Sequence, residues 1–233
     1  MIYSASINGI HMLKTYNMPL ESMNCVQPPE IKKNSIDIPG RNGILDLTDF
    51  FGRTFYENRT ITMNFGRIYD KTIWPQIYSE VLNNFHGKRC QIIFDDDPNY
   101  YWEGRVSVDS YERTQRLGTL TITVDADPYK YTIGNTSEND WLWDPFDFDY
   151  GVIREYGNIQ VNGTLDFIVD GTPMPSVPEI EVSSDMQVRF NGKTYELKYG
   201  INKIYEIEII NGQNLLTFIG DGTIKINYKG GSL

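Results

Sequence analysis

The sequence has few of the residues that build metal centres and disulfide frameworks. It contains only two cysteines, Cys25 and Cys90, and two histidines, His11 and His86, among 233 residues. Neither cysteine lies in a CxxC or cysteine/histidine ligand spacing, so we expect no structural zinc site. The two thiols are either free in a reduced cytoplasm or joined in one bridge, and counting free thiols after denaturation distinguishes these alternatives.

Long apolar runs and basic surfaces are also missing. No apolar run approaches the ~20 residues of a membrane span, and the N-terminus lacks the basic and apolar regions of a signal peptide. We therefore expect a protein made in the cytoplasm with no membrane partner. The net charge of −10 disfavours nucleic acid as a partner. Most of the acidity lies in residues 132–233, which hold 7 Lys/Arg against 15 Asp/Glu.

What the sequence does contain is short segments of alternating apolar and polar residues, which are typical of half-buried strands. In residues 36–65 this alternation is interrupted by Pro39-Gly40-Arg41-Asn42-Gly43 and again near Gly52. Proline, glycine and asparagine allow the chain to reverse at such points. The pattern predicts a meander of three strands whose apolar face must be covered by another element.

One segment has a helical period instead. Its apolar residues lie at positions i, i+3, i+4, i+7, i+8 and i+11, and they are Trp74, Ile77, Tyr78, Val81, Leu82 and Phe85. This spacing predicts an amphipathic helix over residues 72–86. Gly87 can adopt the left-handed conformation that ends a helix. We expect this helix to cover the meander, although a partner's helix groove is the alternative use of the stripe.

The remaining segments are also predicted to form strands. Residues 100–111 and 116–124 form a predicted hairpin, and the domain boundary is expected near Tyr131. Asn-Gly and Asp-Gly pairs at 191–192, 211–212 and 221–222 predict hairpin turns in the second half. The fold class is therefore mainly β: residues 1–131 form a β-sandwich-like domain with one helix, and residues 132–233 form a connector and a small antiparallel β-sandwich.

No residue set nominates a catalytic, cofactor or metal site. Asp95-Asp96-Asp97 is the best metal candidate, but it lacks the spacing of a calcium loop, and a simple acidic turn is the alternative. A pair of carboxylates acting as acid and base stays open, although no motif identifies one. His86 at the predicted helix end favours a capping role over catalysis, and GxSxG is absent. We therefore expect no enzyme, no cofactor and no metal.

An ordered series of motifs carries a family resemblance. The series begins with PGRNGxLDLT at residues 39–48, followed by Gly52 and Tyr56-x-Asn58-Arg59, and it continues to Asp127-Pro128-Tyr129-Lys130. It resembles the N-terminal domain of the distal tail protein (Dit) family of long-tailed, siphovirus-type bacteriophages and prophages. The similarity is looser over the last 50 or so residues, whose fold in the family resembles galectin-like or carbohydrate-module folds.

The resemblance implies a non-enzymatic virion protein at the tail tip, assembled in the host cytoplasm as a hexameric ring. Its partners would be the tail-tube protein, a tail-associated hub or tip protein and possibly a receptor-binding protein. The subunit-interface hypothesis rests on seven residues: Pro39, Gly40, Arg41, Asn42, Gly43, Arg59 and Arg105. Arginine suits this role because its planar fork binds carboxylates bidentately. The alternative is that the arginines hold turns within one subunit.

A carbohydrate-binding protein is the alternative function. Trp141 and Trp143 are flanked by aspartates and could stack on sugars of host surface glycans. The alternative for these tryptophans is docking of the connector against a domain. Fold similarity alone does not establish sugar binding.

Overall fold

The computed structural model describes residues 2–22, 26–68, 74–113, 117–133 and 156–233. The chain divides into two compact units, residues 1–130 and 131–233. The described strand pairings are antiparallel, which confirms the predicted mainly β fold class. Within the described part, neither helix is long and apolar enough to cross a membrane.

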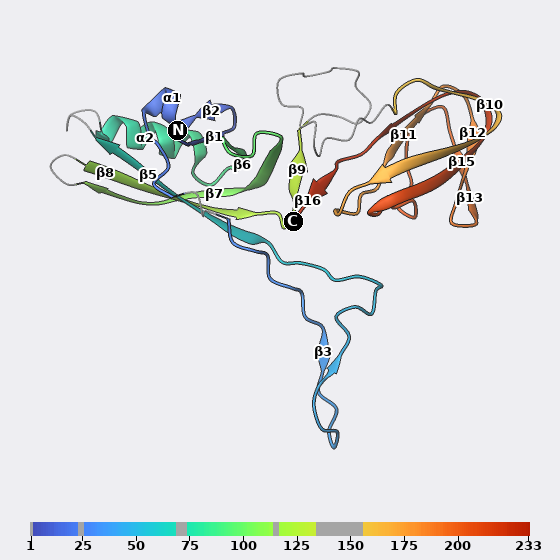
Figure 1. Ribbon diagram of the computed structural model, residues 1–233, viewed down its shortest axis with the longest axis horizontal. Coiled ribbons are helices and arrows are strands. Elements are labelled where there is room, and N and C mark those ends of the chain that lie inside the picture. Colours follow the sequence, from blue (N-terminus) through green and yellow to red (C-terminus); the bar gives the residue numbers. More distant parts are fainter. Residues whose placement is uncertain (1, 23–25, 69–73, 114–116, 134–155) are drawn as a thin grey trace. The chain divides into compact units, whose positions relative to one another are not determined.

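The first unit is built on one antiparallel sheet (Figure 1). The strands of this sheet that lie wholly within the unit are, in order, β2 (Ile10–His11), β1 (Ala5–Ile7), β6 (Arg89–Phe94), β7 (Tyr100–Arg113), β8 (Leu117–Ala126) and β5 (Arg59–Ile68). The register between β7 and β8 confirms the predicted hairpin, with a bulge between Val108 and Ser110. Alternate residues of these strands form a single buried core, while the opposite face is mostly polar.

Helix α2 (Trp74–Phe85) closes this core and confirms the predicted helix. Its residues Trp74, Ile77, Val81 and Phe85 are buried in the core that includes the inner faces of β5, β7 and β8. Gly87 follows the helix with a φ of +75°, in the left-handed region that glycine adopts at low cost. The apolar stripe is therefore used within the unit.

The first unit contains a second, short helix that the sequence analysis missed. Helix α1 (Met12–Tyr16) lies where only strands were predicted, so the expectation of one helix in this domain is wrong. The His11 side chain accepts a hydrogen bond from Lys14 N at its start, and Asn17 ends it at a φ of +54°. A five-residue helix is too short to show a helical period, so only these cap residues could have indicated it.

The three-strand meander predicted for residues 36–65 is wrong. β3 (Ser35–Ile36) and β4 (Leu45–Asp46) pair only with each other in a separate two-stranded sheet, and β5 pairs with β8. Helix α2 accordingly covers the main sheet instead of the hairpin. Figure 1 shows the hairpin at the end of an extension that leads away from the sheet of its own unit. We call residues 27–58 the arm.

The second unit contains a six-stranded antiparallel sheet. Its members are β10 (Ile159–Gly171), β11 (Glu179–Val182), β12 (Met186–Phe190), β13 (Lys193–Leu197), β14 (Gly200–Lys203) and β15 (Gly212–Asn227). β15 pairs with β10 along one edge and with β12 and then β11 along the other. Their inward residues form a second core. Thr132 N, at the end of β9 (Lys130–Thr132), donates a hydrogen bond of 3.0 Å to Gly230 O, directly before β16 (Gly231–Ser232).

The three turn predictions in the second unit have different outcomes. Asn191 and Gly192, with φ of +46° and +78°, form the turn between β12 and β13, which confirms that prediction. Asp221-Gly222 lies inside β15, so the turn predicted there is wrong. The turn at 211–212 is also wrong as a hairpin, because Gly212 begins β15 while Ile207 and Ile209 before it belong to no strand.

Candidate functional site: an exposed arm

The arm has no buried residue anywhere along its length. Every position from 27 to 58 is exposed or only half-buried, and several large apolar side chains are among the exposed ones. They are Ile31, Ile36, Ile38, Ile44, Phe50, Phe51 and Phe55. Soluble monomers rarely expose large contiguous apolar patches, and such patches often mark interaction sites.

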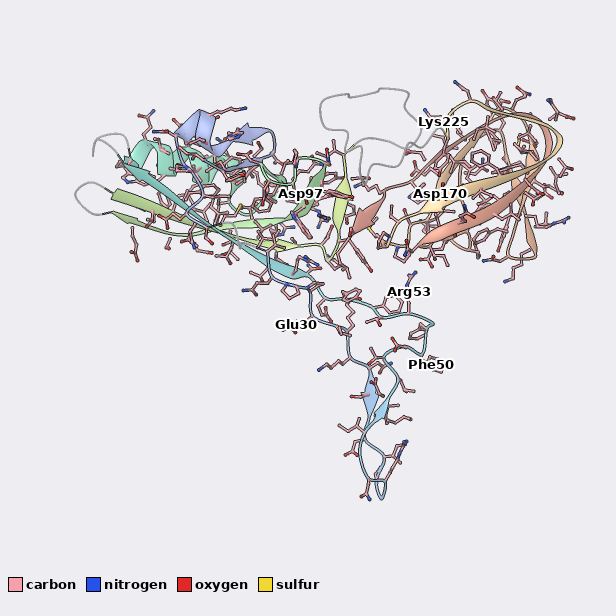
Figure 2. The ribbon with its side chains drawn as sticks, viewed as in Figure 1. Glu30, Phe50, Arg53, Asp97, Asp170 and Lys225 are labelled. Carbon is pink, nitrogen blue, oxygen red and sulfur yellow. The ribbon has the colours of Figure 1, made fainter. Side chains whose placement is uncertain are left out.

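The arm is nevertheless ordered by local hydrogen bonds. At its base, Lys32 N donates to Phe55 O and Glu57 N donates to Glu30 O, each at 2.8 Å. Further out, Leu47 N donates to Asn34 O at 2.7 Å. These hydrogen bonds hold the outgoing and returning halves of the arm together, although the arm has no core. Figure 2 labels Glu30 near the base of this extension, and Phe50 and Arg53 on its other half.

The tip of the hairpin holds five of the seven predicted interface residues. Pro39, Gly40, Arg41, Asn42 and Gly43 are all exposed. Gly40 and Gly43 have φ of +83° and +77°, conformations that require glycine here. Arg41 N donates to Ile38 O at 3.1 Å, so its backbone closes the turn while its side chain is exposed.

The returning half of the arm presents its aromatic residues through a second turn. Gly52 N donates to Asp49 O at 2.9 Å, and Thr54 Oγ1 donates to Asp49 Oδ1 at 2.8 Å. This turn places Phe50 and Phe51 edge to face, with ring centroids 5.4 Å apart and more than two thirds of each residue exposed. The sequence analysis recognised the turn but missed this aromatic pair, whose adjacency in the sequence was the available signal.

Arg59, the sixth predicted residue, follows the arm directly and is placed differently. It is only 6% exposed, and its Cζ lies 4.5 Å from the centre of the Trp102 ring. Burial lowers the pKa of its guanidinium group. The seventh residue, Arg105, is exposed, and its Nη1 donates to Gly87 O at 2.7 Å, next to the end of helix α2. The structure therefore brings the tip residues together but separates them from Arg59 and Arg105.

The other candidate residues of the first unit hold local structure. Asp95 accepts a hydrogen bond from Ser4 N at 2.8 Å and lies 3.1 Å from His11 Nε2, whereas Asp97 lies 2.6 Å from Lys130 Nζ. The described residues include no group of three or more His, Cys, Asp or Glu placed to hold a metal. His86 Nδ1 accepts a hydrogen bond from Val108 N at 3.0 Å.

Cys90 is buried, and Asn8 Nδ2 donates to its Sγ at 3.3 Å. Burial raises the pKa of the Cys90 thiol. Cys25 lies outside the described residues.

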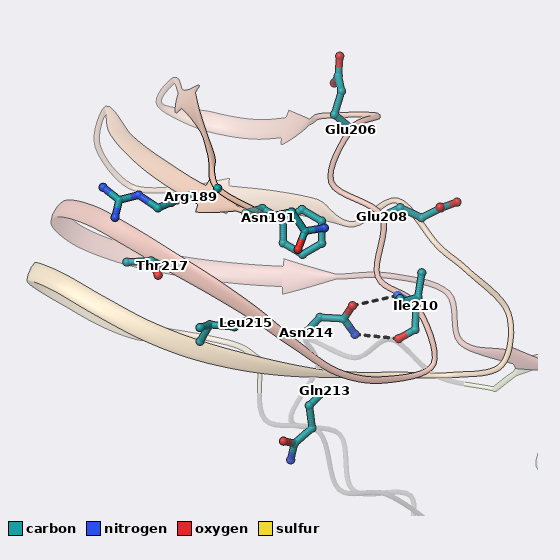
Figure 3. Close-up of a pocket in the computed structure, with 11 residues that line it drawn as sticks. Arg189, Asn191, Glu206, Glu208, Ile210, Gln213, Asn214, Leu215 and Thr217 are labelled. Carbon is teal, nitrogen blue, oxygen red and sulfur yellow. Dashed lines mark hydrogen bonds between the residues drawn. The ribbon is translucent and has the colours of Figure 1, made fainter. Parts of the chain in front are cut away.

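The second unit has an open pocket of about 630 Å³ on the outer side of β15. Arg189, Asn191, Glu206, Glu208 and Gln213 supply its polar groups, and Leu215 and Ile210 supply apolar surface. Figure 3 shows the charged ends of Arg189, Glu206 and Glu208 pointing in different directions. Asn214 is engaged in hydrogen bonds to the backbone of Ile210. The polar groups do not converge on one reacting atom, which general acid–base chemistry would need.

The two tryptophans of the glycan-binding hypothesis are not among the residues that line this pocket. Trp141 and Trp143 lie outside the described residues. Sugar binding at these tryptophans stays a prediction.

The arm is ordered by its own hydrogen bonds and exposes large apolar side chains, and near its base the rings of Tyr56 and Tyr129 pack edge to face with centroids 6.0 Å apart. The profile of the phage tail protein RIFT-related domain matches residues 10–126, which is half of the chain. The chain therefore belongs to this family of phage tail proteins.

The comparison with solved structures identifies a similar fold. The crystal structure of the SPP1 Dit protein (gp 19.1) matches with a TM-score of 0.62 and 14% sequence identity, covering 100% of both chains. That protein is described as a paradigm of the hub adsorption apparatus of phages that infect Gram-positive bacteria. The family match thus confirms the predicted phage tail protein family, and the SPP1 Dit structure confirms the predicted fold. Comparison with the sequences of curated proteins gives no match.

Proposed function

We propose that this phage tail protein is a distal tail hub. In this proposal six copies form a ring that joins the tail tube to the tip and to the receptor-binding apparatus. The ring is assembled in the host cytoplasm and becomes part of the virion tail tip. Its role is structural, without catalysis or a cofactor. The observation that carries the proposal is the arm, an ordered segment without a buried residue, seven of whose large apolar side chains are exposed.

The arm gives the ring a physical mechanism. The arm of one copy would dock on a different surface of the next copy, so the contact between copies is heterologous. Heterologous contacts produce a closed ring when the rotation from copy to copy returns to the first copy. Docking would remove the exposed isoleucines and phenylalanines from water, which is the main favourable term in association. Arg41 at the tip presents a fork of donors that can bind a carboxylate of the neighbouring copy.

Two comparisons support this proposal. The family match covers the unit that carries the arm, and the SPP1 Dit protein, described as part of a hub, shares the fold over the whole chain. The partners of the ring, namely a tail-tube protein, a tail-associated hub or tip protein and a receptor-binding protein, are part of the proposal. The second unit, with its open outer pocket, is the proposed attachment side for the receptor-binding apparatus.

A shortened arm provides the experiment. Deleting residues 37–44 and inserting Asn-Gly between Ile36 and Leu45 keeps the paired ends of β3 and β4 and closes them with a two-residue hairpin turn. We expect the full-length protein to give rings in negative-stain images and a mass near six copies by light scattering. The shortened protein should unfold at the same temperature in dilute solution, yet give few or no rings. A single-copy mass for the full-length protein at high micromolar concentration would refute the ring.

A further inference from the structure

In the part of the chain that the structure describes, Arg59 is a mostly buried positive charge without a counter-charge. Its Nε is fully buried and has no hydrogen-bond partner. Among the residues that the structure describes, its side chain makes no ion pair and no hydrogen bond, and its one specific contact is with the Trp102 ring at 4.5 Å. Arginine keeps its proton in proteins, so the charge persists. A charge that is mostly removed from water and has no partner is unfavourable, and buried charges in proteins are normally paired.

The space around Arg59 is formed by small residues of neighbouring strands. Arg59 of β5 lies opposite Ala126 of β8, which in turn lies opposite Gly104 of β7. Ala126 carries only a methyl group, so the side chain directly opposite Arg59 is small. Trp102 lies on the same face, two residues before Gly104 in β7. The sheet therefore holds the guanidinium group at the end of the core, where the arm begins.

We propose that a carboxylate on the arm of a second copy completes this site as the partner of Arg59. This inference rests on the ring proposed above and names one ion pair within it. The arm carries five carboxylates, at Glu30, Asp37, Asp46, Asp49 and Glu57.

Three of these carboxylates already have a partner in their own arm. Asp46 accepts a hydrogen bond from Thr48 N, Asp49 accepts one from Thr54 Oγ1, and Glu57 lies 3.9 Å from Lys32 Nζ. Among the described residues, the side chains of Asp37 and Glu30 have none. Glu30 lies at the base of the arm, where its carbonyl bonds to Glu57 N. Asp37 lies beyond β3 toward the tip, so it is the first candidate to reach a neighbouring copy.

The test distinguishes an Arg59 charge that strengthens association between copies from one that stabilises the folded single chain. Arg59→Met removes the charge and keeps an apolar chain of similar length over Trp102. Arg189→Met, at an exposed arginine of β12 in the second unit, is the matched control. For each full-length variant, sedimentation equilibrium gives the self-association constant, and thermal unfolding in dilute solution gives the stability of the single chain.

We expect Arg59→Met to unfold at the same or a higher temperature and to associate at least about tenfold more weakly. The control should change neither quantity. Asp37→Asn should weaken association similarly, and it should add nothing in the Arg59→Met background. If Asp37→Asn has no effect, each of the other four arm carboxylates is neutralised in turn. One of these changes must then weaken association and add nothing in the Arg59→Met background.

Several results would overturn the inference while leaving the ring intact. These are unchanged association of Arg59→Met, failure of that variant to fold, or the absence of coupling to all five arm carboxylates. A free anion is the other possible source of the negative charge. If sulfate raises the unfolding temperature of the dilute wild type but not of Arg59→Met, a small anion occupies the site instead. A wild type that never associates would refute the ring as well.

Discussion

The aromatic pair of the arm provides a test in which assembly and folding should respond differently. Phe50 and Phe51 are 71% and 72% exposed in the single chain. Complete burial of a phenylalanine side chain contributes roughly 1.5–3 kcal/mol. If docking of the arm removes most of this exposed area from water, replacing both residues with serine should cost about 2–4 kcal/mol of association free energy, roughly a 30- to 700-fold weaker association constant.

The same double change should have little effect on the folding of the chain. The two rings contact each other at 5.4 Å between centroids, but they are not part of either core. Substitutions at exposed positions usually change stability by less than about 0.5 kcal/mol. The unfolding temperature in dilute solution should therefore remain near that of the wild type, and sedimentation equilibrium should report the loss of association.

The second unit offers a control matched in exposure. Tyr199 and Ile201 are 77% and 71% exposed, so changing both to serine removes a similar exposed apolar area at a site outside the arm. We expect this control to associate as the wild type does. Equal association of the Phe50/Phe51 variant and the wild type, or an equal loss in the control, would refute the docking of the arm.

Three further predictions concern the stability of the units. Gly104→Ala should lower the free energy of unfolding in urea by more than about 2 kcal/mol, because a Cβ there would lie 2.5 Å from a backbone oxygen of β8. In a Cys25→Ser variant, Cys90 should react with a thiol reagent only as fast as the protein unfolds, because it is 1% exposed and burial raises the pKa of its thiol. A hydrogen bond from the Tyr199 amide lowers the pKa of Asp185. The ionised carboxylate therefore stabilises the folded unit at neutral pH, and this stabilisation is lost on acidification below about 4. NMR titration should place the midpoint of Asp185 below that of a free aspartate.

The sequence predicted elements well where the period and the turn chemistry agreed. The stripe from Trp74 to Phe85 fixed helix α2, because six apolar residues at helical spacing can be buried together only on one face. Asn191-Gly192 was interpreted correctly because both residues adopt positive φ in a two-residue hairpin. In these cases the local sequence contains all the information that the element needs.

The sequence did not predict that β15 continues through Asp221-Gly222, because the same residue types occur in turns and at close approaches between strands. Gly220 and Gly222 have φ of +144° and +148° inside the strand, and Gly163 of β10 lies opposite Gly220. Added Cβ atoms at Gly220 and Gly222 would lie 2.7 Å and 2.6 Å from side-chain atoms of Met186 and Ser184, so the chain passes close to its neighbours there. Asp-Gly thus indicated a turn, whereas the glycine permits close approach within a continuous strand.

The misinterpreted meander and the arm have the same physical cause. Alternation of apolar and polar residues indicates that one face of a strand will be covered, but it does not identify the chain that covers it. In β3 and β4 the alternation is real, yet each strand has only two residues, and an isolated two-stranded hairpin is marginally stable in water. Glycines at defined φ shape its tip, and its isoleucines remain exposed. A hairpin specified this closely but left without a core in its own chain is explained if the cover comes from a neighbouring copy, which would then dock on an arm already shaped by its own hydrogen bonds.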